Sequence, residues 1–164
     1  VSVVARNAGE QKTETFFVTG LLHGVGKMVL DRFLSDHFDL AMRRSIEKGI
    51  PLWQAERETL GVSNAQAGGI MLDLWKLSRD MSAAVEFQED PSSAPENFRK
   101  GSAYILVGNV LARVLSLGDC GETIVPRITE SSLALAGITP EQWPRLMELT
   151  VDEAQRAAVF MDMS

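Results

Sequence analysis

Apolar residues recur every three or four positions along almost the whole chain, and this period constrains the fold more than any other feature. Glycine, proline and capping residues bracket each periodic segment. No stretch of useful length alternates strictly between apolar and polar residues, as a half-buried strand would. The sequence therefore predicts an all-α fold. With 164 residues, the chain is long enough for one compact multi-helix domain and too short for two ordinary ones.

The breaks in the pattern predict where individual helices begin and end. Two capping boxes, Ser63 to Gln66 and Thr139 to Gln142, mark two helix starts because each pair of side chains can satisfy the exposed amides of a first turn. Asp36 is expected to cap a helix of its own. The expected helical ranges are 1–8, 13–22, 27–33, 36–48, 52–60, 64–75, 79–90, 95–117, 130–136 and 143–161. The expected core includes Phe16, Phe17, Val18, Leu21, Leu22, Met28, Phe33, Ile70, Met71, Leu74, Trp75, Met81, Val85, Ile105, Leu106, Ala112 and Leu115.

Charge and cysteine content exclude several classes of function. The formal net charge is -6 and the isoelectric point is near 4.9, so we expect no nucleic acid and no anionic membrane surface as partner. Cys120 is the only cysteine, which precludes an intrachain disulfide and favours a cytoplasmic location. Every apolar run is shorter than the roughly 20 residues that a bilayer span requires. The opening residues read as a helix already under way, which indicates a fragment of something longer.

The segment Gly20 to Lys27, GLLHGVGK, places a histidine among glycines beside a lysine. A phosphate-binding loop does not fit, because Gly20 lies six residues before Gly26 instead of five and Met28 replaces the hydroxyl residue. A dinucleotide-binding fingerprint does not fit either, since Val29 stands where its third glycine belongs.

This segment does resemble the signature line of the HDOD branch of the HD-type metal phosphohydrolases. Three further segments are similar to the same family in the same order: Glu56 to Ser78, Ala83 to Pro91 and Tyr104 to Leu115. The resemblance implies an HD-domain-like helical fold over residues 1–164. It also implies that the helical lobe preceding this region in the family is absent, so that the chain corresponds to roughly the second half of the family domain.

The resemblance assigns five residues to the positions around the family's metal site: His23, Asn64, Gln88, Glu89 and Asn109. A hydrolytic HD site needs several imidazoles and carboxylates on one or two metal ions. Here Gly24 replaces the aspartate beside the signature histidine, and amides replace three other ligands. Only His23 and Glu89 could still coordinate. We therefore expect no catalytic residues, no metal and no cofactor.

Each of these residues also has a plain structural interpretation. His23 is expected to be buried or half-buried and bonded to a backbone carbonyl, and Asn64 to stand at a helix start beside its cap. Asn109 is expected to hydrogen-bond to His23 or Gln88 as a polar remnant. Lys27 is expected to be a surface residue or a neighbour of a helix start, and not a phosphate anchor. His37 matches no family position and is expected to be exposed.

The resemblance implies a non-catalytic regulatory or binding module of bacterial signal transduction. A protein partner or a second copy of the chain is the expected partner, because helices that lack the preceding lobe would expose an apolar face. A small anionic ligand in the cleft around His23 is a further interpretation. Two alternatives stay open: a metal-dependent phosphohydrolase acting on nucleotides or cyclic nucleotides, and a purely structural dimerisation domain.

Overall fold

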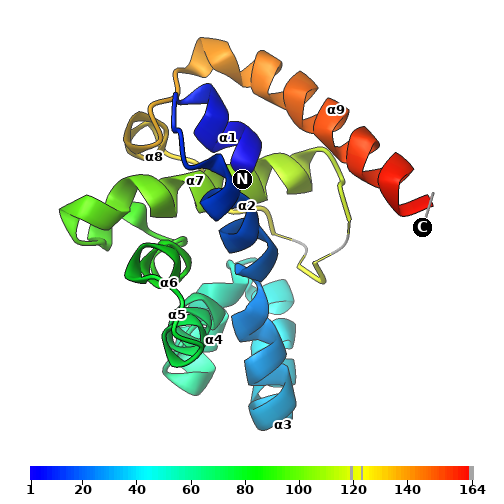
Figure 1. Ribbon diagram of the computed structural model, residues 1–164. Coiled ribbons are helices and arrows are strands. Elements are labelled where there is room, and N and C mark those ends of the chain that lie inside the picture. The colour runs from blue at the N-terminus through cyan, green and yellow to red at the C-terminus, as the bar shows by residue number, and fades with distance from the viewer. Residues whose placement is uncertain (119, 123, 163–164) are drawn as a thin grey trace.

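The computed structural model describes residues 1–118, 120–122 and 124–162, with the side chains of 159–162 left aside. These residues form helices joined by short loops and contain no strand, which confirms the all-α prediction (Figure 1). The α-helices are α1 (Ser2–Asn7), α2 (Thr13–Leu22), α3 (Val25–Lys48), α4 (Leu52–Leu60), α5 (Asn64–Leu74), α6 (Arg79–Glu86), α7 (Glu96–Val114), α8 (Glu130–Leu135) and α9 (Trp143–Asp162). Two single-turn 3-10 helices are η1 (Pro91–Ser93) and η2 (Pro140–Gln142).

The central element is α7, which crosses the middle of the molecule with α1 and α8 on one side and α6 on the other (Figure 1). Its buried side chains Tyr104, Val107 and Leu111 form the main core with Val4 of α1 and Leu146 of α9. The helix ends at Val114, three residues before the predicted end at Leu117. Within it the predicted core positions divide: Ile105 and Leu106 are buried, whereas Ala112 and Leu115 are half-buried.

The predicted break before Asp36 is a kink inside one helix. α3 runs over 24 residues and bends at Leu34, whose φ of −136° and ψ of 37° depart from helical values. Asp36 therefore lies within the helix and caps nothing, because the amides around it already bond within α3. Beyond the kink, Ala41 packs with Leu52 and Ala55 of α4 in a separate small core.

The packed face of α5 combines small residues with Leu72 and is not the apolar stripe that the sequence predicts. Gly68 and Gly69 are buried because α6 comes too close for side chains. A Cβ atom on Gly69 would lie 2.7 Å from the Cβ atom of Glu86, and one on Gly68 would lie 3.0 Å from a methyl carbon of Val85. Three members of the predicted stripe are exposed as a result: Ile70 (59%), Leu74 (70%) and Trp75 (49%). The predicted inward residues of α6, Met81 and Val85, are buried.

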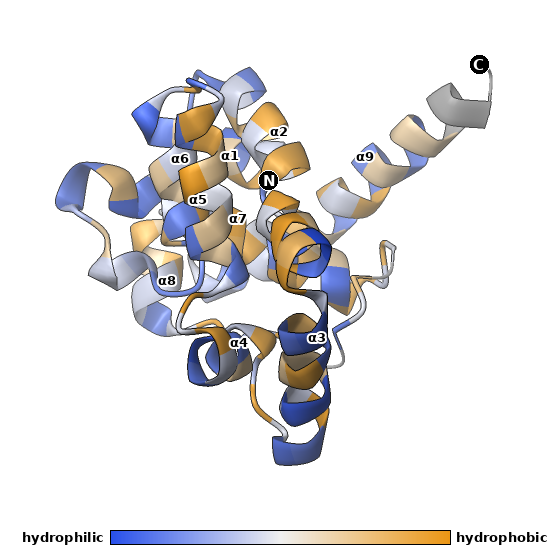
Figure 2. Cartoon of the chain, turned by 90° about the horizontal axis from the view of Figure 1, so that it is seen from below, coloured by the Kyte–Doolittle hydropathy of each residue, from blue (hydrophilic) through white to orange (hydrophobic). Residues whose placement is uncertain are grey.

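The outer face of α2 and the start of α3 is apolar and exposed. The residues that contradict the predicted core are Phe17 (55%), Val18 (42%), Leu21 (68%), Met28 (72%) and Phe33 (74%). α2 contacts the body through Phe16 and Leu22, while no described helix covers its other side. In Figure 2 the ribbon of α2 is coloured largely as hydrophobic.

α9 begins against the core at Leu146 and then extends away from the body in both views (Figures 1 and 2). The side chains at positions 155–158 are all exposed. Neither α9 nor any other helix among the described residues combines the length and hydropathy needed to cross a bilayer.

Candidate functional site

One small cavity collects all five residues that the resemblance singled out: His23, Asn64, Gln88, Glu89 and Asn109. They come from the end of α2, the start of α5, the turn after α6, and α7. Lys27, Trp53 and Glu122 complete much of the wall. The free volume is only about 40 Å³. Since a water molecule occupies about 30 Å³ in the liquid, this space suits water and is far too small for a nucleotide.

His23 follows the last residue of α2 and is held by its own helix. Its Nδ1 atom lies 2.6 Å from the carbonyl oxygen of Gly20, to which it donates in the neutral tautomer. Burial lowers the pKa of His23, and the Lys27 ammonium lowers it further against the opposing effect of that hydrogen bond. The imidazole is therefore neutral near pH 7. The half-buried, carbonyl-bonded histidine that we predicted is confirmed, and His37 is exposed on α3 as expected.

Asn64 is held by a buried carboxylate that the sequence analysis did not single out. The capping box at Ser63 is confirmed and fixes Asn64 as the first residue of α5. From there its backbone N–H and its side-chain Nδ2 both donate to Glu56 Oε2, at 2.7 and 2.8 Å. Glu56 belongs to α4 and is fully buried, so burial raises its pKa. Nothing in the local pattern distinguishes Glu56 from the exposed Glu58 beside it, which is why it was missed.

The turn after α6 closes a second side of the cavity. Gln88 Nε2 donates to the carbonyl oxygen of His23 at 3.1 Å, and Ser63 Oγ donates to Glu89 Oε2 at 3.0 Å. Burial raises the pKa of Glu89 to about 8, against the lowering effect of the Ser63 hydroxyl. Within the described part of the chain, Asn109 makes neither of the hydrogen bonds expected of it, because the amide of Gln88 is directed to the His23 backbone instead.

A cluster of three charged side chains covers the third side. Lys27 Nζ pairs with Glu122 Oε1, and Arg113 Nη1 lies 2.9 Å from Glu122 Oε2. Arg113 Nη2 also donates to the carbonyl oxygens of Glu122 and Ile124, at 3.0 and 2.7 Å. The Arg113 and Glu122 side chains are only 8% and 13% exposed. Lys27 lies in the first turn of α3, as the helix-start alternative predicted, and its side chain is only 25% exposed. Its partner lies 95 positions away, beyond the reach of any local pattern.

The side chains in this cavity do not fit the metal site of a catalytic HD protein. Among the described residues, no three His, Cys, Asp or Glu side chains are grouped so that they could hold a metal ion. Glu56 and Glu89 are engaged by Asn64 and Ser63, and both have raised pKa values. The ammonium of Lys27 brings a positive charge to the same cavity, which opposes the binding of a cation.

The family model of the HDOD domain matches residues 1–91 of the 164. The chain belongs to the HDOD family. The match contains three of the four segments that suggested this resemblance. The segment Tyr104 to Leu115 lies outside this match, although α7 supplies Asn109 to the cavity around His23. The matched residues begin with α1 and end at Pro91, the first residue of η1.

Two further comparisons are consistent with this assignment. The chain superposes on the crystal structure of a "putative phosphohydrolase" from Shewanella amazonensis SB2B with a TM-score of 0.69, at 22% identity, over 92% of this chain and 54% of that one. That similarity establishes the fold. An uncharacterized protein of Treponema pallidum (strain Nichols) is 23% identical over 141 residues, which are 86% of this chain and 27% of that protein. The chain thus spans about half of the first protein and about a quarter of the second.

Proposed function

We propose that this HDOD chain is a non-catalytic regulatory or binding module in bacterial signal transduction. Signal transduction is the context that membership of the family suggests. The family comparison supports an HD-like domain, and the chemistry of the cavity supports the absence of hydrolysis.

The observation that carries the proposal is the Lys27–Glu122–Arg113 cluster beside His23. A metal-dependent phosphohydrolase needs a cation that binds a water molecule and lowers its pKa. In this cavity the positive charge belongs to side chains, which cannot activate water in that way. The nearby Glu89 carboxyl is mostly protonated at neutral pH, because its pKa is raised to about 8. A protonated carboxyl is a poor metal ligand.

The exposed apolar face of α2 and α3 supports the binding part of the proposal. Contiguous apolar patches on a folded surface mark sites of interaction with other macromolecules. Leu21 and Met28 are 68% and 72% exposed there, on the face that we expected to require a partner or a second copy of the chain.

The proposal predicts that the chain neither binds a catalytic metal nor hydrolyses phosphodiesters. Protein purified without chelator should contain substoichiometric iron, manganese and zinc by mass spectrometry. Added Mn²⁺, Fe²⁺ or Zn²⁺ should leave the melting temperature unchanged, since only a ligand that binds the folded state shifts it. Bis(p-nitrophenyl) phosphate should be hydrolysed no faster than in buffer.

The matched control is His23→Gln, which removes the imidazole from the cavity. A stoichiometric metal ion, or chelator-sensitive hydrolysis, that is present in the wild type and lost in this variant would contradict the proposal and favour a metal-dependent phosphohydrolase.

A further inference from the structure

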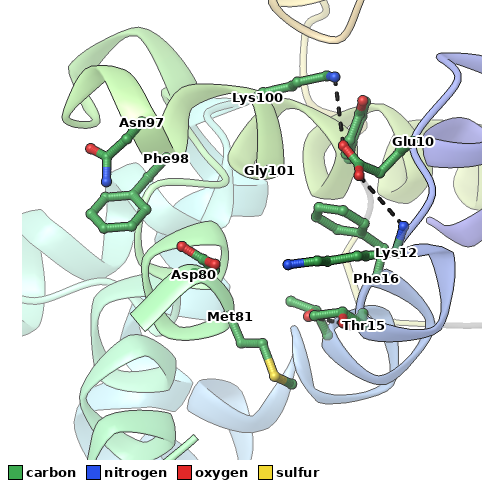
Figure 3. A pocket seen from close by; sticks show the side chains of 12 residues that line it. Glu10, Lys12, Thr15, Phe16, Asp80, Met81, Asn97, Phe98, Lys100 and Gly101 are labelled. Carbon is green, nitrogen blue, oxygen red and sulfur yellow. Dashed lines mark hydrogen bonds and ion pairs between the residues drawn. The ribbon is translucent and has the colours of Figure 1, made fainter. Parts of the chain in front are cut away.

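A second, larger cavity lies at the opposite end of α2, apart from the site around His23. Its volume is about 260 Å³, the space of about nine water molecules at ~30 Å³ each. The loop before α2, the first turns of α2, the start of α6 and the start of α7 enclose it (Figure 3). Of the four family segments only the last touches this cavity, through its first residue Tyr104, and the proposed function does not use the cavity.

One part of the cavity wall is aromatic. The rings of Phe16 and Tyr104 meet edge to face with centroids 5.0 Å apart. Phe98 lies across the opening on α7, and Met81 lines the side formed by α6 (Figure 3). The Tyr104 hydroxyl is buried without a hydrogen-bond partner among the described residues, although its proximity raises the pKa of Lys100. Such a wall favours a ligand with an apolar portion.

The rest of the wall carries charges of both signs. Lys100 lies 3.6 Å from Glu10, so these two side chains balance each other. Lys12 and Asp80, in contrast, have no hydrogen-bond or ion-pair partner for their side chains in the described part of the chain. Figure 3 shows the ammonium end of Lys12 directed across the cavity toward the Asp80 carboxylate, with no bond between them.

This arrangement disfavours ligands that carry only a negative or only a positive charge. An anion beside Lys12 would also meet the carboxylates of Asp80 and Glu10, and a cation beside Asp80 would also meet the ammonium groups of Lys12 and Lys100. A ligand that carries both an anionic and a cationic group can pair with Lys12 and Asp80 together, and each contact is then a charge-assisted hydrogen bond.

We propose that this cavity binds a small zwitterion with an apolar side chain, a ligand of the amino-acid class. Its carboxylate pairs with Lys12, its ammonium group pairs with Asp80, and its side chain packs on Phe16 and Phe98. The volume of about 260 Å³ suits a single amino acid.

The test is titration of the full chain with L-phenylalanine and L-leucine by calorimetry, with ¹H–¹⁵N chemical shifts as a second readout. We expect saturable binding that shifts the backbone amides of Thr15 and Gly101 in the cavity wall. Lys12→Gln and Asp80→Asn should each weaken binding about tenfold, as expected for the loss of a charge-assisted contact. Both residues are exposed, so folding should survive, and thermal melts check this.

Two sets of controls make the result decisive. 3-Phenylpropionate and phenethylamine each carry one of the two charges and should bind at least about tenfold more weakly than L-phenylalanine. Lys76→Gln and Asp39→Asn remove exposed charges elsewhere and should leave binding unchanged. The proposal is overturned if neither amino acid binds at about 10 mM, or if the single-charge analogues bind as well. It is equally overturned if Lys12→Gln and Asp80→Asn bind like the wild type.

Discussion

At the scale of single residues, most polar groups in and next to the cavity around His23 form hydrogen bonds or ion pairs with one another. Glu122 accepts from Lys27 and Arg113, while Glu56 accepts twice from Asn64 through one oxygen. The other oxygen of Glu56 is buried without a partner among the described atoms. Such a buried, unpaired acceptor costs about 1–3 kcal/mol, and more when it is charged. The raised pKa of Glu56 fits this, since protonation removes the charge.

Glu89 predicts a specific dependence of stability on pH. Its pKa is raised from 4.5 to about 8 in the folded chain, so between these values the folded state holds a proton that the unfolded state has lost. The free energy of unfolding contributed by this group therefore falls as pH rises from about 4.5 and levels off above about 8. Glu89→Gln, which can still accept from Ser63, should gain stability relative to the wild type across that window.

The measurement is urea denaturation of both proteins between pH 5 and pH 9. The difference between the two curves cancels the titration of His23 and of the amino terminus, whose pKa values are lowered by burial. A difference that does not change with pH would show that Glu89 is solvated and titrates normally.

At the scale of helices, close packing between α3 and α5 depends on Gly26. A Cβ atom there would lie 1.8 Å from the backbone oxygen of Asn64 and 2.6 Å from the backbone nitrogen of Gly68. Backbone atoms cannot rotate away as a side chain would. The contact also places Lys27, the next residue, beside the cavity, so the same glycine serves both packing and the site.

Gly26→Ala should therefore separate α3 from α5 and lower the free energy of unfolding by about 3 kcal/mol, the upper range for overpacking. Gly24→Ala is the matched control, since a Cβ atom on Gly24 meets nothing within 4 Å. Because Gly24 is the N-cap of α3, that control should cost less than about 1 kcal/mol. Denaturation midpoints test both variants. Equal losses would mean that the α3–α5 contact is looser than described.

At the scale of the whole molecule, the helices surround α7 unevenly. α7 is covered by α1 and α8 on one side and by α6 on the other, whereas the outer face of α2 is open and α9 extends away (Figure 1). A helical segment with few tertiary contacts is only marginally stable in water. The two ends of α9 should therefore differ in local stability, because the first turns pack against the core and the side chains at 155–158 are exposed.

Hydrogen exchange should reveal that contrast. Backbone amides at 155–158, where every side chain is exposed, should exchange at least about a hundredfold faster than those of α7 between Ser102 and Leu111. The first turns of α9 around Leu146 are the internal control and should be protected. Equal protection along α9 would indicate that another surface covers the helix in solution, for example that of a second copy.

Local patterns predicted the helical class, both capping boxes and most helix ends, because these features depend on residues within one or two turns. The predicted burial was less accurate. Ile70 and Leu74 are exposed because α5 packs through a face that contains glycines. A pattern of hydrophobic residues does not identify glycine as a contact residue. Leu21 and Met28 are exposed because no described helix lies over them.

The candidate site was likewise predicted only in part. The family resemblance selected five residues that share one cavity. Four of them lie at or next to helix ends, and the fifth, Asn109, lies within α7. Glu56 and Glu122 were not predicted, because each acts through a partner that local spacing cannot identify.

By itself, then, the amino-acid order determined that the chain is helical, where most of its helices start, and which positions resemble those around the metal site of the HD family. Only the tertiary structure decided which helix faces are buried, and that lysine and arginine occupy the neighbourhood of that site. The physical reason is the separation along the chain of the residues that interact. Helix formation is a matter of hydrogen bonds four residues apart, whereas burial and charge pairing join residues that are brought together only when the whole chain folds.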